Sequence, residues 1–214
     1  MVGSSVAVVE GCHGPGGQGG RVEAGVTGVD AARVDVTTVE LLRHAKARSR
    51  RSWSPRPDRE RPLDAKGRAQ AKWLAAHLSE ADPVRAIVTS PSVRCRETVE
   101  PLAQSADCEV HDDHRLADLR RVPVTDQGSA WVSAAWLGGR SVAAISDAVA
   151  RPAHGRIVVC SHGDVIAAIL GVLAGRDDLA LADAAVRKGA WVTLRFGPDG
   201  RCLAATPHDP APMR

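Results

Sequence analysis

From Thr37 onward, short apolar runs alternate with longer stretches in which apolar residues recur every three or four positions. Residues 39–42, 86–89 and 156–160 have the length and the Val, Ile and Leu content of buried strands. A weaker apolar run at 109–111 predicts one more short strand. Strands that alternate with helical patterns are typical of a mostly parallel sheet.

The stretches between these strands carry helix start signals. Asp64 is a suitable N-cap for a helix whose apolar face repeats with helical spacing. Ser90 and Pro91 predict the cap and first residue of a second helix. Later helical patterns are interrupted at Gly138-Gly139, which predicts two separate pieces, and residues 161–164 open a last helix. Three of these helices have an apolar face with helical spacing. The faces are Ala71, Leu74, Ala75 and Leu78 after Asp64, then Val142, Ile145 and Val149 after Gly139, and Ile166, Ile169, Leu170 and Leu173 in the last helix.

Near the C-terminus, residues 190–196 and 201–205 predict two strands joined by the four-residue loop Gly197-Pro198-Asp199-Gly200. A hairpin at the end of a parallel sheet adds an antiparallel edge. We therefore predict a three-layer α/β/α sandwich with a mostly parallel central sheet and an antiparallel edge.

The domain boundaries follow from the same pattern. Residues 1–35 contain Gly14-Pro15-Gly16-Gly17-Gln18-Gly19-Gly20 and few large apolar side chains, so we expect a flexible tail. This glycine run is not a phosphate loop, because no Lys-Ser/Thr follows it. We expect one catalytic domain over residues 36–206 and a short tail over 207–214.

Composition narrows the class of protein. The 214 residues are 44% hydrophobic and 25% charged, which is ordinary for a globular domain. No apolar run is long enough for a membrane span and the N-terminus does not resemble a secretory signal, so we expect a cytoplasmic protein. Five widely spaced cysteines indicate reduced thiols, and a net charge of +3 is too small to indicate nucleic-acid binding.

Polar residues follow three of the predicted strands at their carboxyl ends. The first strand leads into Arg43 and His44, the second into Ser90 with Arg94 one helical turn later, and the later strand into His162. In an open α/β sheet these strand ends lie at one edge, where ligands bind. Helix N-termini there favour an anion. The set predicts a phosphate pocket with an imidazole available to attack.

Three of these segments, taken in order, resemble the signature of a known family. Residues 42–45 (LRHA), 90–98 (SPSVRCRET) and 159–163 (VCSHG), with 61–71 as a fourth segment, resemble the histidine phosphatase (phosphoglycerate mutase-like) superfamily. The resemblance covers roughly Thr37 to Ala205. The small size is similar to the phosphohistidine phosphatase branch, and the sequence is still more similar to the C-terminal phosphatase half of two-domain MutT/Nudix hydrolases. No Nudix-like sequence precedes residue 37.

The resemblance implies that His44 is the nucleophile and becomes phosphorylated transiently. Arg43 and Arg94 would hold the phosphoryl oxygens, and His162 would donate a further hydrogen bond. No metal or other cofactor is implied, because arginines supply the positive charge. The family's acid sits after the third strand, which points to Asp118 in Leu116-Ala117-Asp118. Three rivals stay open: Glu97, Asp112 and Asp113.

The basic loop from Lys46 to Arg61 is expected to contact substrate, although an ordinary solvated loop fits equally well. Further phosphates would meet its cations, and Trp53 could stack on a base. Its members and their neighbours form the predicted substrate-binding set: Lys46, Arg51, Trp53, Arg61, Ser90 and Gly163. The run His111-Asp112-Asp113-His114 is interpreted as a solvated turn, because adjacent strand residues point to opposite faces.

The function hypotheses follow in order. First is a metal-independent phosphatase acting through His44 on nucleoside di- or polyphosphates or another small phosphorylated metabolite. The alternatives are a protein phosphohistidine phosphatase and, in another class, a non-catalytic phosphate-binding regulatory module. A sugar-phosphate mutase ranks lower, because residues 112–155 are short for the insert of such enzymes. We expect a small phosphorylated substrate as partner, neither nucleic acid nor membrane, and an oligomeric state compatible with a homodimer.

Overall fold

The structure is a computed structural model that describes residues 36–80, 82–118, 130–151, 154–181 and 185–210. The predicted tail over residues 1–35 lies outside this range. The strands are β1 Thr37–Arg43, β2 Val84–Thr89, β3 Val110–Asp112, β4 Arg156–Ser161, β5 Trp191–Phe196 and β6 Cys202–His208. The α-helices are α1 Arg50–Trp53, α2 Ala65–Ser79, α3 Val93–Ala106, α4 Ala130–Val149 and α5 Gly163–Asp177, with short 3₁₀ helices η1 Asp58–Glu60 and η2 His114–Leu116.

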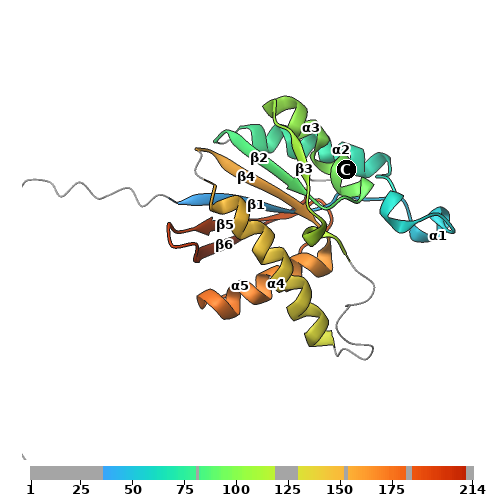
Figure 1. Ribbon diagram of the computed structural model, residues 1–214. Helices are drawn as coiled ribbons and strands as arrows, with labels where there is room; N and C mark the ends of the chain where they lie inside the picture. Colours follow the sequence, from blue (N-terminus) through green and yellow to red (C-terminus); the bar gives the residue numbers. More distant parts are fainter. Residues whose placement is uncertain (1–35, 81, 119–129, 152–153, 182–184, 211–214) are drawn as a thin grey trace, which may run out of the picture. The chain divides into compact units, whose positions relative to one another are not determined.

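The six strands form one sheet in the order β3-β2-β4-β1-β5-β6. β3, β2, β4 and β1 run parallel, whereas β5 and β6 are antiparallel to their neighbours. Helices α2 and α3 cover one face of the sheet and α4 and α5 cover the other (Figure 1). The predicted three-layer α/β/α sandwich with an antiparallel edge is therefore confirmed.

Strand β1 shows why the central strands are apolar on both sides. Val39 and Leu41 belong to the core formed with α4 and α5, whereas Leu42 belongs to the core formed with α2 and α3. Because successive side chains of a strand point to opposite faces, a sheet covered by helices on both sides needs apolar residues at both sets of positions.

The structure corrects two predicted helix boundaries. α4 passes through Gly138-Gly139 without a break. A Cβ atom added at Gly138 would lie 2.4 Å from the backbone oxygen of Ala168, so this glycine lets α4 approach α5 closely. α3 starts at Val93 with Ser92 as its N-cap, later than predicted. The Ser90 hydroxyl accepts from the Ser92 amide at 3.4 Å and is also bonded to His162.

The C-terminal strand extends further than the sequence pattern indicated. β6 continues to His208, so Pro207 and His208 of the expected C-terminal tail pair with Val192 and Trp191. Proline is tolerated in this position because β6 is at the edge of the sheet. No helix within the described ranges is long and apolar enough to cross a membrane.

Candidate active site

The carboxyl ends of β1, β2 and β4 lie together. Arg43 is in register with Ser161, and Thr89 is in register with Cys160. The next residues continue this pairing, because the His44 amide donates to the Ser161 carbonyl (3.0 Å) and the Ser90 amide to the Cys160 carbonyl (2.9 Å). The strand-end residues predicted to meet at one edge therefore do so.

His44 is a buried imidazole whose Nε2 atom has no hydrogen bond within the described ranges. Its side chain hydrogen-bonds through Nδ1 to the Ala45 carbonyl (2.8 Å), and a carbonyl can only accept, so Nδ1 carries the proton. Desolvation by burial lowers the pKa of His44 to about 3, against the raising effect of the Ala45 bond and with help from the nearby charges of His162, Arg94 and Arg43. The ring is thus neutral at pH 7 and presents the lone pair of Nε2.

Arg43 packs its guanidinium against the start of α5. A Cβ atom at Gly163 would lie 2.6 Å from Arg43 Cζ, so a side chain larger than hydrogen at position 163 would displace the cation. Arg43 Nη1 donates to the Val186 carbonyl (2.6 Å). Gly163 therefore contributes space at the helix N-terminus, where backbone dipoles favour an anion.

Arg94, His162, Ser90 and Asp118 form a connected hydrogen-bonded group. Arg94 Nη2 donates to Asp118 Oδ2 (2.8 Å) and lies 3.2 Å from His162 Nδ1. His162 Nε2 is 2.8 Å from Ser90 Oγ and 3.5 Å from Asp118 Oδ1. Since guanidinium only donates, His162 Nδ1 accepts and Nε2 carries the proton in the neutral ring. The His162 and His44 rings are 5.4 Å apart, edge to face.

Two arginine nitrogens at this site are buried without a hydrogen bond. The Nε atoms of Arg43 and Arg94 have no partner among the described residues. A buried guanidinium N–H group without an acceptor is unfavourable. The Nε atom of Arg85, away from this site, is in the same state, so what indicates a binding place is that two such donors lie beside His44. Two such donors next to a neutral imidazole suit an anionic group with several oxygens, such as a phosphoryl group.

The structure distinguishes the four candidate acids by their partners. Asp118 is bonded to Arg94 and lies beside His162 in the active-site group. Glu97 instead accepts from the Leu63 amide (2.6 Å). Asp112 is paired with Arg96. Asp113 caps η2 and binds Arg115 at 2.8 Å. Among the residues that are described, no group of three or more His, Cys, Asp or Glu could hold a metal ion.

The loop residues predicted to bind substrate differ in burial and in their partners. Arg61 is buried and donates to Asp58 (2.9 Å) and the Arg48 carbonyl (2.7 Å). Lys46 pairs with Asp64 at 3.3 Å and is half exposed. Trp53 carries the guanidinium of Arg56 over its ring at 4.7 Å and lines, with residues 50 and 54–59, a hollow of about 720 Å³. Arg51 is exposed on α1 and does not line this hollow.

Two positioning residues were not predicted from the sequence. The Asp58 carboxylate lies between Arg61 and Arg94, and its backbone oxygen accepts from Arg94 Nη1 (2.7 Å). Burial acts to raise the pKa of Asp58, but the Arg61 hydrogen bond and the Arg94 charge hold that pKa below its usual range. Thr98 accepts from the Ala45 amide (3.0 Å) and donates to the Arg94 carbonyl (2.6 Å). The sequence features that could have indicated these roles are the carboxylate of Asp58 within a basic loop and the hydroxyl of Thr98 on an apolar helix face.

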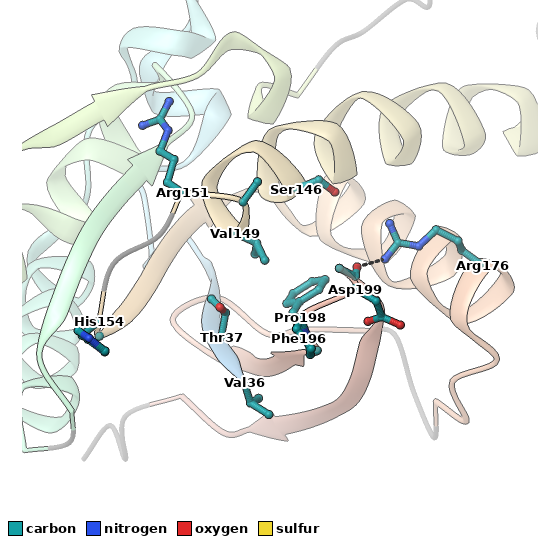
Figure 2. A pocket seen from close by; sticks show the side chains of 14 residues that line it. Val36, Thr37, Ser146, Val149, Arg151, His154, Arg176, Phe196, Pro198 and Asp199 are labelled. Atoms are coloured by element: carbon teal, nitrogen blue, oxygen red, sulfur yellow. Dashed lines mark hydrogen bonds between the residues drawn. The ribbon is translucent and has the colours of Figure 1, made fainter. Parts of the chain in front are cut away.

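A separate cavity of about 940 Å³ lies at the opposite edge of the sheet, where β1 and β4 begin (Figure 2). The end of α4 and the β5–β6 hairpin line it, and Arg176 of α5 donates there to the Gly200 carbonyl (3.0 Å). None of the strand-end residues described above contributes to this cavity. Its size therefore does not make it the candidate active site.

Comparisons with known proteins match the part of the chain that contains these active-site residues. The sequence profile of the histidine phosphatase superfamily (branch 1) matches residues 39–129 and 120–206. An 8-oxo-(d)GTP phosphatase of Mycolicibacterium smegmatis is 33% identical over 172 residues, which are 80% of this chain and 48% of that protein. This chain thus spans about half the length of that relative.

Solved structures share the fold at lower identity. Mycobacterial glucosyl-3-phosphoglycerate phosphatase superposes with a TM-score of 0.57 at 20% identity, covering 81% of this chain and 98% of the other. A SixA phosphohistidine phosphatase structure from Agrobacterium tumefaciens gives a TM-score of 0.52 at 19% identity, covering 79% and 96%. Fold, profile and the sequence relative agree, and the chain belongs to the histidine phosphatase superfamily, whose members include hydrolases of phosphate esters.

Proposed function

We propose that the protein is a metal-independent phosphatase that forms a phosphohistidine on His44 and acts on nucleoside di- or polyphosphates or another small phosphorylated metabolite. One observation carries the proposal: the buried Nε donors of Arg43 and Arg94, which have no partner within the described residues, belong to the cations near the neutral imidazole of His44. Phosphoryl transfer depends mainly on positioning and on neutralising the oxygens of the transferred group. The guanidinium groups of Arg43 and Arg94 perform both tasks.

In the first step, the Nε2 lone pair of His44 attacks phosphorus. A P–N bond forms, the bond from phosphorus to the leaving oxygen breaks, and the leaving oxygen keeps the electron pair. Asp118, held beside His162 and Arg94, transfers a proton to that oxygen when the leaving group is an alkoxide. The hydrogen bond from Nδ1 to Ala45 keeps the attacking nitrogen aimed at the pocket.

In the second step, water attacks the phosphohistidine. An O–P bond forms and the P–N bond breaks, so His44 returns to its neutral state. The carboxylate of Asp118 takes the proton of the water, and phosphate leaves as the product. That carboxylate is left by the first step when the leaving group is an alkoxide, and is the starting form, paired with Arg94, when the leaving group is a phosphate. Splitting the displacement in two replaces one difficult step by two easier ones.

The nucleotide preference has two supports. The M. smegmatis relative is named for a nucleoside triphosphate substrate. Trp53 lines a hollow together with Asp58 and three arginines, Arg50, Arg56 and Arg59. Asp58 also pairs with Arg94 of the phosphate site. A base and a phosphoryl group could therefore be bound by neighbouring parts of the protein.

The test is to trap the intermediate. Incubation with a ³²P-labelled phosphodonor should give an acid-labile, base-stable phosphoryl group in the wild type and none in His44→Asn. Turnover of p-nitrophenyl phosphate should fall by at least about 1,000-fold in the same variant. His111→Asn is the matched control, because His111 is exposed on β3.

Two results would overturn the proposal. One is full activity in His44→Asn. The other is phosphate binding without turnover of p-nitrophenyl phosphate, which would make the chain a phosphate-binding module. A panel of nucleotides, sugar phosphates and a phosphohistidine protein is then assayed with the wild type and with His44→Asn. It distinguishes small-molecule substrates from protein substrates.

A further inference from the structure

A short segment after α5 is fastened to the active-site arginine. The Val186 carbonyl accepts from Arg43 Nη1 (2.6 Å), and the Gly189 amide donates to the Arg43 carbonyl (3.1 Å). The Arg43 amide in turn donates to Ala190 (3.0 Å). Three bonds thus hold residues 186–190 against the residue that precedes the nucleophile. Lys188, which the sequence analysis did not single out, lies within this segment and is exposed.

One buried amide links Lys188 to the other side of the site. Gln70 of α2 accepts from the Lys46 amide through Oε1 (2.9 Å) and donates through Nε2 to the Lys188 carbonyl (3.2 Å). Gly189 has a φ of +76°, and a Cβ atom there would lie 3.0 Å from the Gln70 amide. The backbones of Lys46 and Lys188 are therefore fixed on either side of Gln70, at the end of the strand that delivers His44.

Positive charge is concentrated at this place. Partial burial lowers the pKa of Lys188, and the cations of Arg43, Arg61, Lys46 and Arg50 lower it further. The nearby carboxylates already pair with other cations, because Asp58 pairs with Arg50, Arg61 and Arg94, and Asp64 pairs with Lys46. The Lys46 ammonium has three donors, so its pair with Asp64 leaves donors for an anion.

The Lys188 ammonium has no ion pair in the part of the chain that the structure describes. An unpaired cation beside four others is unfavourable unless an anion binds among them.

We propose that Lys188 and Lys46 form a subsite for a second phosphoryl group, the one adjoining the phosphorus that His44 attacks. This inference rests on the proposed function and makes the substrate a phosphoanhydride, such as a nucleoside diphosphate, in preference to a monoester. When the P–N bond forms, the bond to the bridging oxygen breaks and the departing phosphate keeps the electron pair. The two ammonium groups stabilise that added negative charge, so this leaving group needs no proton.

The test compares two substrates in matched variants. kcat/KM is measured for a nucleoside diphosphate and for p-nitrophenyl phosphate in wild type, Lys188→Gln, Lys188→Arg and Lys72→Gln. Lys188→Gln should lower kcat/KM for the diphosphate about 10- to 100-fold, the loss of one charge-assisted bond, and change that for the monoester less than about twofold. Lys188→Arg should retain most activity. Lys72→Gln, which removes the same charge from an exposed position on α2, should change neither.

A binding measurement keeps the two proposals apart. A methylene-bridged nucleoside diphosphate, which cannot be cleaved at that bridge, is titrated by calorimetry into wild type and Lys188→Gln. Weaker binding in the variant supports the subsite even if no substrate is turned over, in which case only the proposed phosphatase function fails. Equal losses on both substrates, or unchanged binding of the analogue, would overturn the subsite.

Discussion

At the scale of single residues, His44 shows how burial prepares a nucleophile. An exposed histidine is partly protonated near neutral pH, whereas desolvation and neighbouring cations lower the pKa of His44 from 6.5 to about 3. Neutral imidazole is the nucleophilic form. The same burial that keeps His44 neutral also makes the fold sensitive to acid. Between pH 6.5 and pH 3 the histidine binds a proton in the unfolded chain but not in the folded one.

The first prediction concerns this acid sensitivity. The contribution of His44 to stability is present above pH 6.5 and is lost as the pH falls toward 3, because the unfolded state binds the proton first. Between pH 7 and pH 4, wild type should lose roughly 3 kcal/mol more unfolding free energy than His44→Asn does. Urea unfolding at both pH values measures the difference, with His111→Asn expected to follow the wild type. Parallel pH dependence in wild type and His44→Asn would contradict the buried neutral ring.

The second prediction concerns Asp118 as proton donor. Asp118→Asn keeps a hydrogen-bond acceptor for Arg94 but cannot donate an acidic proton. Hydrolysis of an alkyl phosphate such as glycerol phosphate should fall about 100-fold or more, whereas p-nitrophenyl phosphate, with its better leaving group, should lose less than about 10-fold. The ratio of the two kcat/KM values is the measurement, because kcat/KM reports the transfer to His44, whereas kcat also contains the water step that both substrates share. An equal loss on both substrates would mean that Asp118 only positions Arg94.

At the scale of elements, the contact between α4 and α5 depends on one glycine. Gly138 is buried, and its missing side chain brings α4 next to the Ala168 carbonyl and Val172. Gly139, one residue later, has nothing within 4 Å of the position of a Cβ. In sequence the pair resembles a helix break, but tertiary packing outweighs the low helix propensity of glycine.

The third prediction uses this pair. Gly138→Ala should destabilise the protein by about 1–3 kcal/mol, because the added carbon would lie 2.4 Å from the Ala168 oxygen and the helices must move apart. Gly139→Ala should instead stabilise it by roughly 0.5–1 kcal/mol, because alanine favours the helix and meets open space. Urea unfolding of the two variants is the measurement. Equal effects of the two substitutions would show that the close helix contact is not what position 138 provides.

At the scale of the whole molecule, the sheet explains what could be predicted from the sequence. Arg43, His44 and His162 lie at the carboxyl ends of strongly apolar strands. The parallel topology brings such strand ends together independently of the conformation of the loops. The clustering of Lys188 and Asp58 could not be predicted in this way. Their positions depend on the paths of the segments that connect the larger elements and on individual hydrogen bonds, such as those to Gln70 and Arg94, which leave no periodic signal.

The sheet also carries a buried ion pair in its middle. Arg156 at the start of β4 donates to Glu40 of β1 (3.1 Å) and to the Asp82 carbonyl (2.8 Å). Glu40 also accepts from Thr193 of β5 (2.6 Å). The pair thus joins three neighbouring strands and the end of the loop after α2. Both side chains are at most 6% exposed, so neither charge is shared with water.

The fourth prediction follows from this burial. Glu40→Leu or Arg156→Met alone should lower the unfolding free energy by about 3–5 kcal/mol, because each leaves an uncompensated buried charge. The double variant should lose clearly less than the two losses combined, since it leaves no charge behind. A double-mutant cycle by urea unfolding measures this coupling, and additive losses would contradict it. Because none of the active-site hydrogen bonds involves either residue, kcat of the folded double variant should stay within about twofold of wild type, which places the control of stability and of chemistry in different parts of one sheet.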